Sequence, residues 1–215
     1  MKATYHKYIL QFKRPSGTSR GVMTEKETWF IVLEKEGKKG IGECGILRGL
    51  SIDDRPDYEE KLRWTCANIH LGEDQLWEAL IEFPSIQFGV EMAFRSLGSE
   101  TPFLLFPSDF TNGRKSIPIN GLVWMGEESF MKQQIEEKLA DGFRCVKLKI
   151  GAIDFDAELQ LLRFIREHFT PEQVEIRVDA NGAFDSYLAL NKITQLSEFE
   201  IHSIEQPIQK NNTDS

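Results

Sequence analysis

The chain has 215 residues, which is enough for one large domain or two modest ones. Its 40% hydrophobic and 28% charged residues are ordinary for a globular protein, and its net charge of −8 argues against nucleic acid as a main partner. No apolar run approaches the ~18 residues needed to span a bilayer, so we expect no membrane segment. Residues 1–8 alternate like a strand and lack the apolar centre of a signal peptide.

The cysteines and histidines indicate neither a disulfide framework nor a zinc site. The three cysteines, Cys44, Cys66 and Cys145, are odd in number and lack C-x-x-C spacing. A reducing cytoplasm fits this pattern. The four histidines are scattered without metal-ligand spacing. The sequence carries no signal for an oligomeric state.

Residues 1–101 are expected to form an α+β domain, because strand-like segments come first and helical segments follow. The expected strands are 2–13, 28–36 and 39–44. The expected helices are 58–69, 74–82 and 85–97. Residues 102–116 are rich in turn-forming residues and read as a linker to a second domain, 117–215.

The segment from Arg14 to Gly21 lies between the first two expected strands and is small, polar and basic. One interpretation is a surface hairpin loop. The other is a mobile lid over a neighbouring active site, since lids need a flexible backbone and few buried contacts. In the second case Arg14 and Arg20 would meet an anionic substrate.

The second half of the sequence alternates strand-like and helical segments at regular intervals. The expected strands are 117–124, 144–150, 175–182 and 201–207, and the expected helices are 131–140, 154–169 and 185–199. This alternation predicts a parallel sheet with crossover helices, as in a β/α barrel. An open, doubly wound sheet is the structural alternative, but it would be favoured by a glycine-rich phosphate loop that the sequence lacks.

Two lysines lie one residue apart in the apolar run 144–150. Because side chains in a strand alternate, Lys147 and Lys149 point to the same face. A strand buried on both faces would not carry two cations on one of them, so the alternative is an antiparallel strand with a hydrated face. Asp179 and Glu205 lie at or near the ends of the next two strands, where a β/α barrel places its chemistry.

These ionisable groups support chemistry beside a metal ion. Asp179 and Glu205, on adjacent parallel strands, would repel each other unless a cation separated them, and Mg²⁺ prefers carboxylate oxygens. Asn181 is a further polar group on the face of Asp179. A lysine beside a metal and a second lysine has a lowered pKa, so it can remove a proton next to a substrate carboxylate. The alternative is that both lysines neutralise the acids in a buried ionic network.

Three segments resemble the barrel motifs of the enolase superfamily, muconate-lactonising subgroup: Lys147-Leu-Lys149, Asp179-Ala-Asn181 and Glu205-Gln-Pro207. Gly40-Ile-Gly-Glu-Cys44 resembles a segment of that family's N-terminal capping domain. Within the subgroup, the segments 15–20 and 119–124 are most similar to the o-succinylbenzoate synthase family.

The resemblance implies an α+β capping domain followed by part of a (β/α) barrel, the modified TIM barrel of enolase-like proteins. It also implies a Mg²⁺-dependent carbon–oxygen lyase, a dehydratase that works through an enediolate on the route to menaquinone. Related enzymes with the same motifs are N-acylamino acid racemases and dipeptide epimerases, and they are the alternative.

The resemblance implies a role for each matching residue. Lys149 would be the base, and Lys147 would contact the substrate carboxylate and lower the pKa of Lys149. Asp179 and Glu205 would be ligands of Mg²⁺, or of Mn²⁺ in its place. The residues it places against a small-molecule carboxylate substrate are Lys147, Asn181, Ser19 and Arg20.

The sequence departs from the family pattern in its metal and acid groups. The family has a third acidic metal ligand on the next strand and another lysine on the opposite side of the barrel. This sequence has no residue that corresponds to either of them. Residues 117–215 supply at most four strand–helix units, whereas a barrel has eight strands. We therefore expect the N-terminal half of a barrel, truncated after its fourth strand, with little or no activity alone. The alternatives are two half-barrels that pair and a non-catalytic remnant that binds a partner or metal.

Overall fold

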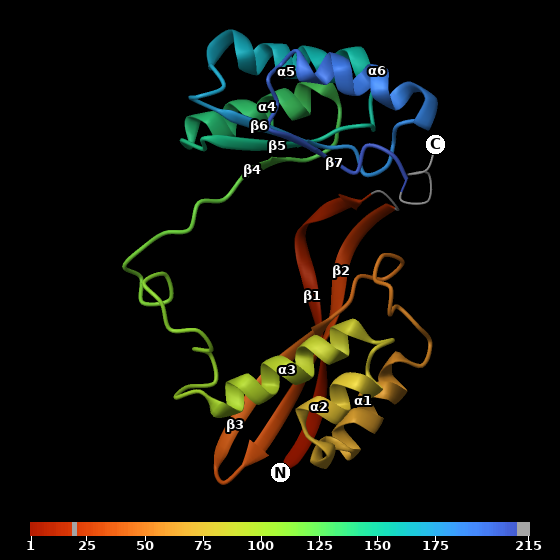
Figure 1. Cartoon of the computed structure of the whole chain (residues 1–215), viewed down its shortest axis with the longest axis vertical. Helices are drawn as coiled ribbons and strands as arrows, with labels where there is room; N and C mark the ends of the chain where they lie inside the picture. The colour runs from red at the N-terminus through yellow and green to blue at the C-terminus, as the bar shows by residue number, and fades with distance from the viewer. Residues whose placement is uncertain (19–20, 210–215) are drawn as a thin grey trace. The chain divides into compact units, whose positions relative to one another are not determined.

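The computed structural model describes residues 1–18 and 21–209. The chain divides into two compact units, Met1–Ser116 and Ile117–Ser215 (Figure 1). Within the described residues, no helix combines the length and the apolar character that crossing a bilayer requires.

The first unit is an antiparallel sheet of order β1-β2-β3, followed along the chain by helices. The strands are β1 (Lys2–Thr18), β2 (Gly21–Lys35) and β3 (Lys38–Gly45). The helices are α1 (Tyr58–Ala67), the short 3₁₀ helix η1 (Ile69–Leu71), α2 (Glu73–Ala79) and α3 (Pro84–Gly98). Trp29, Ile31 and Leu33 alternate along β2 and are buried in its core. The predicted α+β order is confirmed.

The first two strands are longer than predicted, and the loop expected between them is correspondingly shorter. Residues 14–18 belong to β1, and Thr18 pairs with Gly21 at the start of β2. The pairing register shifts between Gln11 and Ser16, around Pro15. A bulge of this kind accommodates a proline, which has no N–H to give to the ladder. The prediction that residues 14–18 belong to a loop was therefore wrong, because they form the end of β1.

The two glycines of the Gly40-Ile-Gly42 segment lie where β3 packs against α3. Being two residues apart, they share one face of the strand. A Cβ at Gly42 would lie 1.8 Å from the carbonyl oxygen of Gly89, and one at Gly40 would lie 2.2 Å from that of Ala93. A Cβ at Gly89 would in turn lie 2.2 Å from Sγ of Cys44. Close contact between the strand and helix backbones therefore explains this motif.

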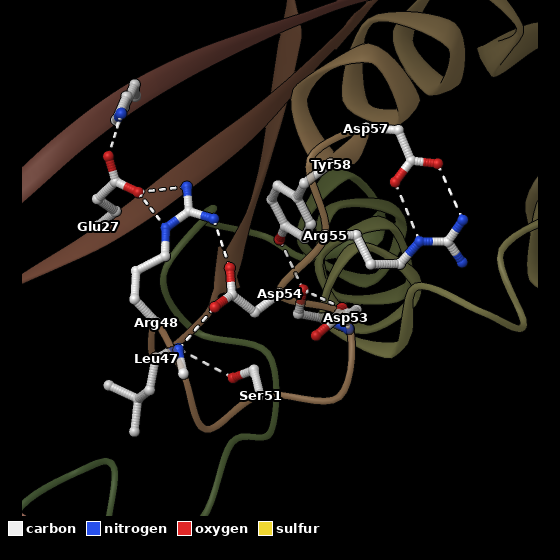
Figure 2. A network of polar contacts seen from close by, with 12 residues as sticks. Glu27, Leu47, Arg48, Ser51, Asp53, Asp54, Arg55, Asp57 and Tyr58 are labelled. Atoms are coloured by element: carbon white, nitrogen blue, oxygen red, sulfur yellow. Dashed lines mark hydrogen bonds and ion pairs between the residues drawn. The ribbon is translucent and has the colours of Figure 1, made fainter. Parts of the chain in front are cut away.

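A polar network fixes the segment after β3 against β2 (Figure 2). The Arg48 side chain donates from Nε to Glu27 and from Nη1 to Asp54, each at 2.6 Å. The second Asp54 oxygen accepts from the Gly49 backbone N–H at 2.6 Å. Glu27 also pairs with Lys7 of β1. One arginine thus links a strand to the turn that follows the sheet.

The second unit is a parallel sheet of order β4-β5-β6-β7 with one helix between each pair of consecutive strands. The strands are β4 (Gly121–Val123), β5 (Cys145–Lys149), β6 (Glu175–Asp179) and β7 (Ser203–Glu205). The helices are α4 (Glu128–Ala140), α5 (Phe155–His168) and α6 (Ser186–Ser197). The predicted parallel alternation is confirmed. β4 is shorter than predicted, and Pro118 in the segment before it has no N–H for strand pairing.

The three helices of this unit lie on one face of the sheet (Figure 1). Val146 and Leu148 of β5 and Ile176 and Val178 of β6 are buried in the core that includes these helices. Because strand side chains alternate, the intervening residues of β5 and β6 point to the opposite face. That face carries the charged groups.

Candidate active site

The charged groups lie together at the carboxyl ends of β5, β6 and β7. The parallel register pairs Lys149 with Asp179 and Asp179 with Glu205. Lys147, two residues earlier on β5, shares the face of Lys149. The backbone register therefore brings four ionisable side chains from three strands to one edge of the sheet.

Asp179 lies at the centre of these contacts and is 2% exposed. Its Oδ2 lies 2.5 Å from Lys149 Nζ and 3.4 Å from Lys147 Nζ. Its Oδ1 accepts from the backbone N–H of Asn181 at 3.0 Å and from Asn181 Nδ2 at 2.9 Å. Burial alone would raise the pKa of Asp179, but the contacts with Lys149, Asn181 and Lys147 lower it below its usual value. Asp179 is therefore a fully partnered, ionised carboxylate.

Lys147 bridges the two acids. Its Nζ donates to Oε2 of Glu205 and also lies 3.4 Å from Asp179 Oδ2. The hydrogen bond to Glu205 and the charge of Asp179 raise the pKa of Lys147, against the opposing effect of burial. The two carboxylates therefore favour the ammonium form of Lys147. In this structure each lysine thus pairs with a carboxylate, and one of the two acids, Glu205, has a side chain that is 61% exposed.

The carboxylates of Asp179 and Glu205 converge on one position, which the ammonium group of Lys147 occupies in this structure. Both acids contact the same Nζ atom. Mg²⁺ commonly binds one or two protein carboxylates and fills its remaining positions with water and substrate. Asp179 and Glu205 could supply these two carboxylates, which would make them part of the ligand set of a Mg²⁺ ion. Residues 1–18 and 21–209 contain no group of three or more acidic, histidine or cysteine side chains placed to hold a metal.

Backbone hydrogen bonds join the loops that carry these residues. The N–H of Ile150 donates to the Asp179 carbonyl at 2.9 Å, and that of Ala180 donates to the Glu205 carbonyl at 3.0 Å. The N–H of Gly182 then donates to the Gln206 carbonyl at 2.7 Å. The segments after the three strands are therefore linked to one another by backbone hydrogen bonds, and these bonds fix the backbone that carries the site residues.

Asn181 and Gln206 adopt left-handed backbone conformations, with φ of 49° and 42°. Such values are uncommon outside glycine and cluster at functional sites. In Asn181 this conformation allows the backbone N–H and the side-chain amide to reach the same Asp179 oxygen. The amide oxygen of Asn181 lies 3.5 Å from Lys149 Nζ. Asn181 therefore contacts both partners of the central ion pair.

Five of the predicted site residues come together here: Lys147, Lys149, Asp179, Asn181 and Glu205. The other two, Ser19 and Arg20, lie outside the described residues. A buried carboxylate behind the site, Glu158, was not singled out from the sequence. The only sequence signal for it was its place in the first turn of the expected helix 154–169, where an acidic side chain can bind backbone N–H groups such as that of Gly151.

Comparison with known proteins decides the family. A family model described as "Enolase C-terminal domain-like" matches residues 131–215. The o-succinylbenzoate synthase of Desulfotalea psychrophila is 43% identical over 98% of this chain. The crystal structure of MenC from that organism matches with a TM-score of 0.80 at 39% identity, covering 97% of this chain and 64% of that one. The chain belongs to the enolase superfamily.

More distant members of the superfamily share the fold. A hydrophobic dipeptide epimerase from a Flavobacteria bacterium is 24% identical over 98% of this chain. The o-succinylbenzoate synthase of Thermosynechococcus elongatus, solved with Mg in its active site, matches over the whole chain with a TM-score of 0.73 at 20% identity. This chain spans 66% of the D. psychrophila synthase, 62% of the epimerase and 63% of the T. elongatus chain.

The expected enolase-like architecture is thereby confirmed. An antiparallel sheet unit is followed by a parallel unit that forms part of a β/α barrel. Three of the four parallel strands, β5, β6 and β7, carry charged groups at their carboxyl ends, which is where β/α barrels place their active sites.

Proposed function

We propose that this chain is part of a cytoplasmic, Mg²⁺-dependent o-succinylbenzoate synthase, which is a dehydratase. It would supply the two lysines of the active site, Lys147 and Lys149, and two of its carboxylates. The observation that carries this proposal is the convergence of Lys149 and Lys147 on the buried carboxylate of Asp179, with Glu205 bound to the same Lys147 Nζ. The 43% identity to the D. psychrophila synthase favours this reaction over others of the superfamily.

In this proposal Lys149 is the general base. It would take the proton from the carbon next to the substrate carboxylate, and the electron pair of that bond would move into an enediolate. The enediolate would then collapse to a carbon–carbon double bond as the neighbouring hydroxyl group leaves, and that hydroxyl would take the proton from Lys149 to leave as water. Proton transfer by a positioned base of this kind typically contributes about 10²–10⁴-fold to the rate.

To act as a base, Lys149 must be free of Asp179, its ion-pair partner in this structure. The role therefore requires the carboxylate of Asp179 to face a cation other than the Lys149 ammonium. Asp179 and Glu205 would hold Mg²⁺, or Mn²⁺ in its place. The metal, when bound, supplies positive charge that stabilises the enediolate.

The remaining residues would bind the substrate. Lys147 would turn from Glu205 to the substrate carboxylate, since a lysine ammonium on a flexible stem can exchange one carboxylate for another. Asn181 would fix Asp179 and contact the substrate. Ser19 and Arg20 would contact the part of the substrate remote from the reacting carbon.

A dipeptide epimerase or N-acylamino acid racemase is the second candidate, because epimerases are among the relatives at lower identity. Both reactions begin with removal of a proton next to a carbonyl carbon. Incubation in deuterated water separates them: deuterium uptake at the α-carbon of a dipeptide would favour the epimerase, and its absence together with o-succinylbenzoate formation would favour the synthase.

The proposal is tested in two forms of the protein. We expect the 215-residue chain alone to show little or no turnover, because its described residues supply only two carboxylates at the site. A chimera in which this chain replaces the aligned part of the D. psychrophila synthase should form o-succinylbenzoate with Mg²⁺. A folded chimera that forms none would contradict the synthase proposal and leave the non-catalytic alternative.

A further inference from the structure

A buried carboxylate lies behind the loop that follows Lys149. Glu158, in the first turn of α5, is 1% exposed, and its Oε1 accepts from the Gly151 backbone N–H at 2.5 Å. Its Oε2 is buried and has no hydrogen-bond partner among the described residues. Burial raises the pKa of Glu158, although the backbone N–H groups of Gly151, Ile153 and Ala152 oppose the shift. A buried acid is costly unless paired, so its position needs an explanation.

Gly151 is the point where the loop after β5 touches the loop after β6. Its φ is +90°, and a Cβ there would lie 2.4 Å from the Ala183 Cβ and 3.3 Å from the Ala180 carbonyl oxygen. Just before it, the N–H of Ile150 donates to the Asp179 carbonyl. The chain is therefore fixed on both sides at the two residues that follow Lys149.

A cationic and aromatic cluster supports the same corner of the unit. Nζ of Lys192, from α6, lies 4.6 Å from the ring centroid of Phe155 and 4.7 Å from that of Phe184. The two rings meet edge to face at 5.8 Å. The charge of Lys192 also favours the ionised form of Glu158. The start of α5 is thereby tied to the loop that follows β6.

We propose that Glu158 is a positioning residue for Lys149, an inference that rests on the base role proposed above. The Glu158 carboxylate fixes Gly151. Only Ile150 separates Gly151 from Lys149, so this contact also sets the backbone direction at Lys149, the last residue of β5. The lysine is thereby held against Asp179 and Asn181. Catalytic groups need support of this kind, because displacements of about 1 Å at a reacting group lower the rate strongly.

The test uses three variants of the chain itself. Glu158→Met keeps a similar volume and removes the acceptor for Gly151. Glu158→Gln keeps an acceptor oxygen without the charge. Ile165→Val, in the same helix and fully buried, is the control for mild loss of core packing. Each protein is acetylated briefly with limiting acetic anhydride, and peptide mass spectrometry gives the labelling rate of Lys149 relative to Lys132.

We expect Glu158→Met to change this ratio several-fold, Glu158→Gln to restore most of the original value, and Ile165→Val to leave it unchanged. An unchanged ratio in Glu158→Met, or the same change in Ile165→Val, would overturn the proposal. The readout needs no turnover, so it is separate from the synthase test. In the chimera, Glu158→Met should lower kcat more than it raises KM, and Glu158→Gln should recover kcat.

Discussion

Lys149 Nζ lies 2.5 Å from Oδ2 of Asp179, and the two residues are register partners on adjacent parallel strands. The aspartate side chain is 2% exposed and the lysine side chain 19%. The acid is fixed by two hydrogen bonds from Asn181, whereas the lysine reaches it through a long and flexible stem. The lysine can therefore change its partner while the carboxylate stays in place, as the base role proposed for Lys149 requires.

The Asp179→Asn substitution should weaken Mg²⁺ binding by the chain. It removes one of the two carboxylates that converge on the site, and we expect a loss of affinity of about tenfold or more, since even supporting groups outside a ligand set contribute that much. Isothermal titration with MgCl₂ measures the change.

The matched control for this substitution is Asp185→Asn. Asp185 caps α6 by accepting from the Tyr187 N–H at 2.8 Å, and asparagine caps helices equally well. Equal Mg²⁺ affinities in Asp179→Asn and Asp185→Asn would contradict the placement of the metal.

The stability of the first unit should depend on pH through Glu27. The hydrogen bond from Lys7 lowers the pKa of Glu27, burial opposes this, and Arg48 lowers it further. With a folded-state pKa below the usual value of about 4.3, Glu27 contributes stability that is present above pH ~4.3 and is lost as the pH falls through the folded-state pKa.

Urea unfolding of the original chain and of Glu27→Gln measures this contribution. We expect the variant to be less stable by about 0.5–1 kcal/mol at pH 7, with a smaller difference at pH 3, because the ion pairs are partly exposed. Glu25→Gln, at an exposed position two residues away, should show no such pH dependence. A difference that grows toward pH 3 would refute the assignment.

The Gly42→Ala substitution should destabilise the first unit by about 3 kcal/mol or more, because overpacking against a rigid backbone carries such costs. Its Cβ would lie 1.8 Å from the Gly89 carbonyl oxygen, which belongs to α3 and cannot move independently. Gly98→Ala is the matched control, since a Cβ at that helical position meets nothing within 4 Å. We expect Gly98→Ala to be neutral or stabilising by about 0.5–1 kcal/mol. Thermal unfolding that ranks the two variants in the reverse order would disprove the close-contact explanation.

The clustering of the lysines and acids could be predicted from the sequence, because strand periodicity and the alternation of strands and helices are visible in it. Two lysines at alternate positions must share a face, and parallel order then places Asp179 and Glu205 on the neighbouring strands. The partner of each lysine could not be derived in this way, because it depends on side-chain conformation. The structure gives Lys147 two carboxylate partners, and these raise the pKa of a group expected to lie beside like charge.

Tertiary contacts account for the other differences between prediction and structure. Glu158 lies among the apolar positions of α5 in the sequence, and only the approach of the Gly151 loop explains why a carboxylate is buried there. The extension of β1 to Thr18 depends on pairing with β2 beyond a register shift, which no local pattern around Pro15 indicates. Both features arise where two separate segments meet.

The formation of o-succinylbenzoate by the chimera, compared with its Lys149→Ala variant, tests the central claim most directly. Lys132→Ala, at an exposed position of α4, serves as the control for loss of a lysine. We predict turnover by the chimera and by Lys132→Ala, and a rate at least about 10²-fold lower in Lys149→Ala, as removal of a general base produces. Turnover by Lys149→Ala at the rate of the control would contradict the assignment of Lys149 as the base.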